Sequence, residues 1–182
     1  MKSQVSQNRF WGKSQCVALV LLGCIALAGC YTTRNRLPSN AKSIAIPVFG
    51  NKTYHEDYTR ALETELSESV RSAFLENGML KVTGREDADL IVEGDVLRIA
   101  RSILRTDRLG DPNNVQYTIT ARISLYDVKQ AKYILRDGVY TNTEKTESGV
   151  YNLNRGENED LGRKNAVQDL GRIISRHVLD LW

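Results

Sequence analysis

Residues 115–126 read Val-Gln-Tyr-Thr-Ile-Thr-Ala-Arg-Ile-Ser-Leu-Tyr, a strict alternation of apolar and polar side chains. Because successive side chains of a β-strand point to opposite faces, this alternation predicts a strand that buries only one face. Antiparallel sheets commonly have one face packed on a core and the other in water. The stretch therefore predicts a sheet with a single covered face.

Four further strands are predicted, over residues 43–49, 80–82, 90–103 and 133–143. The first would place Ile44, Ile46 and Val48 on one face, and Pro47, which has no amide donor, favours a strand end or an edge. The alternation within 90–103 changes phase beside Gly94, which predicts a bulge or a close backbone contact there.

Two helices complete the pattern. The first is expected to begin after Thr53, where Thr53-Tyr54-His55-Glu56 has the form of a capping box, and to end at Asn77-Gly78. The second begins at Asn158, a suitable N-cap, and carries an apolar stripe that includes Leu170 and Ile174. The polar, glycine-containing stretch 148–157 before it is interpreted as a loop.

The element order is β-α-β-β-β-β-α. We expect an α+β fold in which two helices pack on one face of a mixed, mainly antiparallel sheet of four to five strands. The other face of the sheet should be largely polar and free.

The N-terminal region has the order of a secretory signal. Three basic residues precede an apolar run over 16–28, which is too short to span a membrane and ends in Leu27-Ala28-Gly29-Cys30. This ending resembles the lipobox of bacterial lipoproteins, which implies that Cys30 receives a diacylglycerol and an N-acyl chain. Tyr31 is not the aspartate of an inner-membrane retention signal, which favours the outer membrane.

The domain organisation follows from this processing. Residues 1–29 are the signal peptide, residues 30–41 the lipidated N-terminus and tether, and residues 42–182 one α/β domain. The other cysteines, Cys16 and Cys24, leave with the signal peptide, so we expect no disulfide. The mature chain has 22 basic and 22 acidic residues, because three of the 25 basic residues and none of the 22 acidic residues lie in the signal. This balance gives no support to nucleic-acid binding.

No set of residues predicts catalysis or metal binding. Glu93 and Asp95 share one strand face but lack a second catalytic group, so a solvated or partner-facing edge is the preferred interpretation. Asn51 and Thr53 are explained by turn and capping chemistry. The chain has only two histidines, His55 and His177, which predict no metal site. We expect a protein that is not an enzyme and that needs no cofactor beyond the lipid on Cys30.

Segments along nearly the whole mature chain resemble the LPS-assembly lipoproteins called LptE. Their order and spacing carry the resemblance: the lipobox, Leu37-Pro38, residues 42–49, Asn51 and Thr53, residues 62–78, Ala88-Asp89 leading to Glu93-Gly94, residues 117–128 and a C-terminal helix ending at Trp182. The resemblance implies an outer-membrane lipoprotein inside the lumen of a very large β-barrel, LptD, where it helps to deliver lipopolysaccharide to the outer leaflet. A domain of this length is roughly 40 Å across, so only an exceptionally large barrel could enclose it.

Six basic residues are candidates for contact with lipopolysaccharide or with the barrel, because guanidinium groups bind phosphate in bidentate fashion. They are Arg98, Arg101, Arg105, Arg108, Lys129 and Lys132. The alternative for these residues is a solvated loop or a salt bridge to the barrel wall. Five tyrosines add aromatic surface of the kind enriched at interfaces, although some must be core.

A second function remains open at this point. A lipid-tethered periplasmic regulator, such as the activator lipoproteins of peptidoglycan synthases, also combines a strand, a helix and an Ala-Asp step. Such proteins usually have a long linker, whereas this tether has only about ten residues. The short tether favours a task at the membrane surface.

Replacement of Cys30 tests the lipoprotein assignment. Cys30→Ala removes the thiol that would be alkylated, so the precursor should remain uncleaved and should incorporate no lipid. Labelling of cells with a palmitate analogue measures this directly, with Cys24→Ala as the matched control that keeps full labelling. Equal label in wild type and Cys30→Ala would contradict the assignment.

Overall fold

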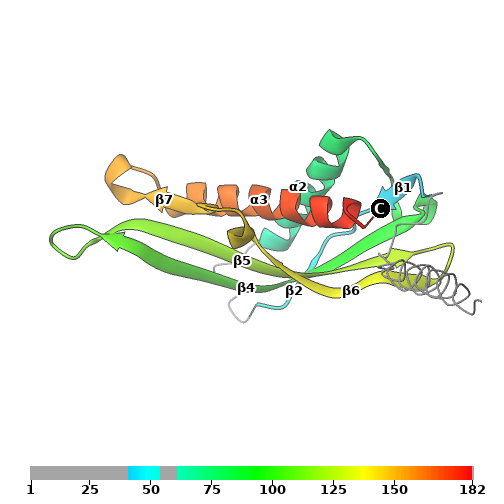
Figure 1. Ribbon diagram of the computed structural model, residues 1–182, viewed down its shortest axis with the longest axis horizontal. Helices are drawn as coiled ribbons and strands as arrows, with labels where there is room; N and C mark the ends of the chain where they lie inside the picture. Colours follow the sequence, from blue (N-terminus) through cyan, green and yellow to red (C-terminus); the bar gives the residue numbers. More distant parts are fainter. Residues whose placement is uncertain (1–40, 54–60, 182) are drawn as a thin grey trace, which may run out of the picture. The chain divides into compact units, whose positions relative to one another are not determined.

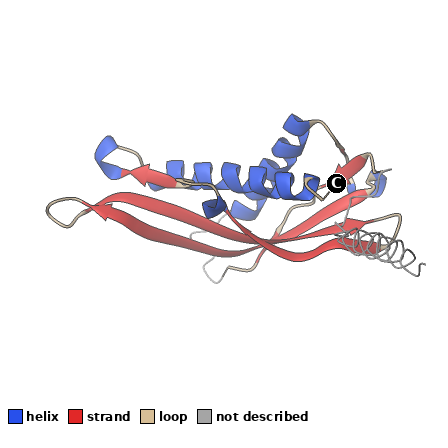
Figure 2. Ribbon diagram, viewed as in Figure 1, coloured by secondary structure: helices blue, strands red, loops and turns tan. Residues whose placement is uncertain are grey.

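The computed structural model describes residues 41–53 and 61–181, which belong to one compact unit. Two helices, α2 (Leu62–Asn77) and α3 (Glu159–Leu179), cover one face of a mixed sheet (Figures 1 and 2). The sheet that the described residues form has seven strands: β1 (Ser43–Ala45), β2 (Gly50–Asn51), β3 (Lys81–Val82), β4 (Leu90–Thr106), β5 (Pro112–Asp127), β6 (Lys132–Thr141) and β7 (Val150–Asn152). The predicted α+β class is confirmed.

The strand order is β3-β1-β4-β5-β6, with β2 added beside β4 and β7 beside β5. The pairs β4–β5, β5–β6 and β5–β7 are antiparallel, whereas β1 and β2 run parallel to β4. On β5 the odd-numbered residues from Val115 to Leu125 are buried and the intervening residues are not. The alternation therefore predicts this strand correctly.

The predicted strand 43–49 is wrong in extent. β1 ends at Ala45, before Pro47, and a separate strand β2 begins at Gly50. Because Pro47 has no N–H, the chain leaves the ladder there and rejoins it beside β4. The detour changes which side chains face the core: Val48 is 60% exposed, and Phe49, at 3%, fills the core position instead.

Gly94 marks a close contact, and the bulge lies three residues later. A Cβ at Gly94 would lie 2.7 Å from Cδ1 of Ile123 and 3.2 Å from Cδ1 of Phe49. The β4–β5 register shifts between Val96 and Arg98, which leaves Leu97 without a partner. The phase change in the sequence therefore reflects both features at neighbouring positions.

Both helices lie where the apolar stripes predict them, but the first begins later than predicted. α2 starts at Leu62, after Ala61 with a left-handed φ of 66°, and not directly after Thr53. It ends at Gly78 with φ of 71°, and the proposed capping box, residues 53–56, falls mostly outside the described residues. The second helix begins at Asn158, whose side chain accepts a hydrogen bond from the amide of Leu161. Neither described helix is long and apolar enough to cross a membrane.

The stretch 148–157, predicted as a loop, contains strand β7 and a short 3-10 helix, Leu153–Arg155. β7 pairs with residues 114–116 of β5, and β6 pairs with residues 120–127 of the same edge. Three residues are too few to show alternation, so sequence periodicity gives no signal for β7.

Asn142 fills the gap between β6 and β7. Its Oδ1 accepts a hydrogen bond from the amide of Ile119 at 2.7 Å, and its Nδ2 donates to the carbonyl of Tyr117 at 3.0 Å and to Oγ of Ser148 at 3.1 Å. The side chain of Asn142 is fully buried. One amide side chain thus replaces a stretch of strand and leaves the edge of β5 satisfied across the gap.

Replacement of Asn142 should be costly. Asn142→Ala leaves the buried amide of Ile119 and the buried carbonyl of Tyr117 without hydrogen-bond partners. We therefore expect the free energy of unfolding to fall by about 2–4 kcal/mol. Urea denaturation of the mature protein measures the loss. The control Asn154→Ala removes an exposed amide from the neighbouring 3-10 helix and should change stability by less than about 0.5 kcal/mol.

Candidate interaction surface

The β4–β5 hairpin extends beyond the two helices (Figure 1). β4 has 17 residues, so at about 3.3 Å per residue it spans roughly 55 Å. Its first residues lie beside β1, where the chain enters the described domain, and its last residues lead into the turn before Pro112. The hairpin tip is therefore at the opposite end of the sheet from the point where the tether joins the domain.

The structure separates the six candidate cations. Four lie along the distal half of β4 and its turn, whereas Lys129 and Lys132 lie at the other end of β5. Arg98 and Arg105 pair in register with Thr120 and Asn114, which alternate with the buried residues of β5. These two arginines therefore belong to the face of the sheet that has no helices.

Arg101 points to the other face. It pairs with Tyr117, a buried residue on the helix side, and its guanidinium lies 2.6 Å from the carboxylate of Glu159 in the first turn of α3. Arg101 thus fastens the hairpin to α3. The arginines do not act as one cluster, because the register of β4 divides them between the two faces.

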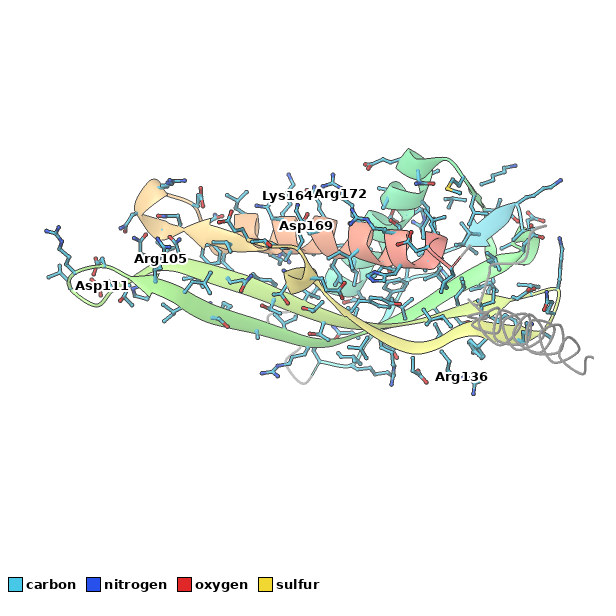
Figure 3. The ribbon with its side chains drawn as sticks, in the orientation of Figure 1. Arg105, Asp111, Arg136, Lys164, Asp169 and Arg172 are labelled. Carbon is cyan, nitrogen blue, oxygen red and sulfur yellow. The ribbon has the colours of Figure 1, made fainter. Side chains whose placement is uncertain are left out.

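Exposed apolar side chains gather at the hairpin end of the domain. Leu109 in the turn is 88% exposed, and Ile103 and Leu104 at the end of β4 are 60% and 48% exposed. Leu153 and Leu161, from the segments beside the hairpin, are also exposed. Large apolar side chains grouped in this way are typical of contact surfaces. Figure 3 shows Arg105 and Asp111 at the same end, so charged groups border the apolar ones.

The helix-free face is largely polar, as predicted, apart from a small apolar cluster around Ala45, Ile91 and Tyr126. Arg122 donates to Asp95 at 2.6 Å and lies 3.6 Å from Asp137, and its hydrogen bond to Asp95 raises the pKa of the guanidinium. Arg85 pairs with Glu93 at 2.9 Å. Glu93 and Asp95 therefore each have a cationic partner, and nothing in this arrangement indicates general acid-base chemistry.

Aromatic residues divide between core and surface. Tyr117 and Tyr151 are buried, and burial raises the pKa of both phenols and of Tyr140. Tyr126 and Tyr133 lie edge to face with ring centroids 5.1 Å apart, and the guanidinium of Arg136 stacks over Tyr133.

Asn51 and Thr53 have the turn chemistry that the sequence predicts. Asn51 accepts hydrogen bonds from the amide and hydroxyl of Thr53, which is turn geometry. His177 packs on Tyr140, and His55 lies outside the described residues. Within residues 41–53 and 61–181, no group of three or more His, Cys, Asp or Glu side chains is arranged to bind a metal.

Asp89 organises the end of the domain nearest the tether. Its carboxylate accepts hydrogen bonds from the backbone amides of Lys42 and Ser43 at 2.8 and 3.2 Å, and Nζ of Lys129 lies at 2.7 Å. The hydrogen bond from Lys129, followed by that from the Lys42 amide, holds the pKa of Asp89 well below its ordinary value of 3.8. Lys129 therefore has a structural partner, while Lys132 has none among the described residues.

Comparison with known families places the domain. The family model for lipopolysaccharide-assembly proteins, LptE, matches residues 41–178. A search of curated proteins finds no significant match.

Several solved structures resemble the chain at low sequence identity. A hypothetical protein from Chlamydia trachomatis has a TM-score of 0.53 at 15% identity, covering 78% of this chain and 98% of its own. A protein from Xanthomonas campestris has a TM-score of 0.49 at 12% identity, covering 82% and 93%, and a minor lipoprotein from Acinetobacter baumannii has 0.46 at 15%, covering 79% and 94%. Only the first of these similarities is high enough to support the fold.

The environment of Asp89 predicts a pH-dependent contribution to stability. Because its folded-state pKa lies below the ordinary 3.8, the stabilisation is present above that pH and is lost as the pH falls through the folded-state pKa. Asp89→Asn should therefore lower the free energy of unfolding by about 1–2 kcal/mol at pH 7, and by progressively less below pH 4.

Denaturation curves for wild type and variant over this pH range measure the difference. Lys129→Ala should reproduce part of the loss at pH 7, because it removes the nearest cation. A difference between wild type and Asp89→Asn that stays constant from pH 7 to about pH 2 would contradict the assignment.

Proposed function

Because this chain belongs to the LptE family of lipopolysaccharide-assembly proteins, we propose that it is a lipid-anchored subunit that plugs a large outer-membrane β-barrel and helps to assemble it for lipopolysaccharide delivery. The observation that carries the proposal is the family match across the whole described domain, from residue 41 to 178. The geometry of the domain supports it in three ways.

The anchor and the tether set the location. Lipid chains on Cys30 would hold the protein in the membrane, with only residues 31–42 between the lipid and the first strand. Twelve extended residues reach at most about 43 Å, so the domain works close to the membrane surface. A barrel in the same membrane is within reach, whereas a partner beyond the cell wall is not.

The polar sheet face suits a water-filled lumen. The Asp95–Arg122 and Arg85–Glu93 pairs are satisfied within the domain, so these four charges can approach a polar wall without losing their partners. Arg98 and Arg105 on the same face have no ion-pair partner among the described residues, so they can contact that wall. Barrels of the outer membrane have polar interiors. A broad, wet contact of this kind is consistent with a plug.

The hairpin tip supplies the apolar contact. Leu109, Leu104 and Ile103 lie exposed on the end of β4 and its turn, and Arg105 and Arg108 flank them without an ion-pair partner among the described residues. Apolar and arginine side chains in one place are the residues that most often dominate binding energy. In this proposal the tip contacts the barrel or the lipopolysaccharide that passes through it, and Arg98 and Lys132 are secondary contacts.

Purification of the complex tests the proposal. The lipoprotein, extracted from outer membranes in mild detergent, should bring down one large barrel in a one-to-one ratio, and depletion of the lipoprotein should leave that barrel misassembled. Leu109→Asp combined with Arg105→Glu should reduce the recovered barrel by at least about fivefold.

A matched control distinguishes the tip from general surface charge. Leu75→Asp combined with Lys81→Glu changes an exposed leucine and an exposed cation elsewhere and should leave recovery unchanged. Recovery of the lipoprotein alone, in a detergent that preserves other barrel complexes, would contradict the plug and favour the tethered regulator.

A further inference from the structure

Four lysines come together at the end of the sheet where the predicted tether joins the domain. The amide of Lys81 donates to the carbonyl of Lys42 at 2.9 Å. The carboxylate of Asp89 accepts a hydrogen bond from the amide of Lys42 and pairs with Lys129. Lys132 begins β6 at the same end of the sheet, opposite the last residue of β5. All four side chains are exposed, and together they form the lysine row.

Most of the lysine row keeps its charge available. Lys129 is engaged by Asp89, whereas the other three lysines have no ion-pair partner among the described residues. The 3-10 helix Arg85–Asp87 carries two exposed acids, and Arg85 fastens it to the helix-free face through Glu93. Neither acid forms an ion pair with the row within the part of the chain that the structure describes. The row therefore offers free ammonium groups to an external partner.

Exposed apolar and aromatic side chains stand beside these lysines. Met79, Val128 and Tyr133 are exposed, and each lies within two residues of a lysine of the row. The guanidinium of Arg136 stacks 4.7 Å from the centroid of the Tyr133 ring, and Figure 3 shows Arg136 toward the same end of the sheet. Lysine, tyrosine and small numbers of apolar side chains are typical of protein surfaces at a membrane–water boundary.

The predicted tether brings this end of the domain to the membrane. Residues 31–42 connect the lipid on Cys30 to β1 and reach at most about 43 Å. A short tether keeps a weak contact available at an effective concentration in the millimolar range, on the order of that of a linked binding module. The hairpin tip lies roughly 55 Å away along β4. The lysine row is therefore the part of the domain that the anchor presents to the headgroups.

We propose that, before it joins a barrel, the anchored protein docks the lysine row on the anionic phospholipid headgroups of its own membrane. The proposal rests on the lipid anchor of the proposed function. The ammonium groups bind headgroup phosphates, while Met79, Val128 and Tyr133 enter the headgroup layer. Each lysine close to an anionic surface strengthens such a contact by roughly fivefold.

Docking at this end turns the hairpin tip away from the membrane, because the row and the tip lie at opposite ends of the sheet. Leu109, at the tip, then stays out of the bilayer and remains accessible to an incoming barrel chain. Entry into the barrel requires release of the row. The docked state is thus a state of the unassembled protein, in which the contact surface for the barrel is kept free.

Depth measurement in vesicles tests the docking. The mature chain has no cysteine besides Cys30, so one introduced cysteine carries the only fluorophore. Val128→Cys probes the row and Leu109→Cys probes the tip. The acylated protein is placed in phosphatidylcholine vesicles with about 30% phosphatidylglycerol and a lipid spin-labelled at its headgroup. The label at residue 128 should be quenched at least about threefold more strongly than the label at 109, and about 1 M salt should remove most of the difference.

Charge removal makes the test specific to the row. The row variant carries Lys42→Gln and Lys81→Gln, and it should lose most of the excess quenching at residue 128. The matched control carries Arg155→Gln and Lys164→Gln, which remove the same net charge from exposed positions away from the row, and it should be quenched as the wild type is. Urea denaturation checks that both variants are as stable as the wild type.

Three results would overturn the docking. The first is a label at residue 128 that is quenched no more than the label at 109, and the second is a row variant that is quenched as strongly as the wild type. The third is a row variant that loses the barrel on purification from outer membranes, because the row would then belong to the barrel contact. The vesicles contain no barrel, and palmitate labelling reports the anchor separately, so the docking and the plug can fail independently.

Discussion

The domain depends on β5 being paired along both of its edges. One edge is paired with β4 from Pro112 to Asp127, and the other is shared by β7, Asn142 and β6 in turn. A strand that buries alternate residues under two helices cannot slip by one position without exposing its whole apolar side. The double pairing fixes this register, and the positions of the helices follow from it.

The surfaces of the molecule follow from the same register. The register between β4 and β5 decides which face of the sheet each β4 side chain occupies. Arg101 therefore lies on the α3 side and Arg98 on the opposite side, although both belong to one basic segment of the sequence. The hairpin keeps its pairing beyond the helices, where nothing covers Ile103 or Leu109. The candidate contact residues are therefore held on a paired strand and its turn, which makes them better ordered than residues on a free loop.

Periodicity predicted the elements whose length allows it. β5, the stripe of α3 with Leu170 and Ile174, and the stop at Gly78 are all as the sequence indicates. The predictions failed where elements are very short or where distant residues decide the structure. Strands β2 and β7 have only two and three residues, and Pro47 divides a stretch that alternates as if it were one strand. The role of Asn142 had no sequence signal, because the β5 backbone groups that it binds, on Tyr117 and Ile119, lie 25 and 23 residues earlier in the chain.

The candidate site shows the same limit. The sequence identifies the cations, but it does not show on which face of the sheet each one lies, because that depends on the register of β4. It also does not reveal that Lys129 pairs with the distant Asp89.

The parallel pairing of β1 has a consequence for the order in which the chain folds. Lys42 lies at the start of the described domain, yet the carboxylate that binds its amide is 47 residues further on, and β4 in turn needs β5. The antiparallel strands β4, β5 and β6 are consecutive and can form early, whereas β1 must close a long loop to join them. The first strand in the sequence is thus among the last to be fixed in the fold, so the chain stays without β1 in place until β4 and β5 have formed.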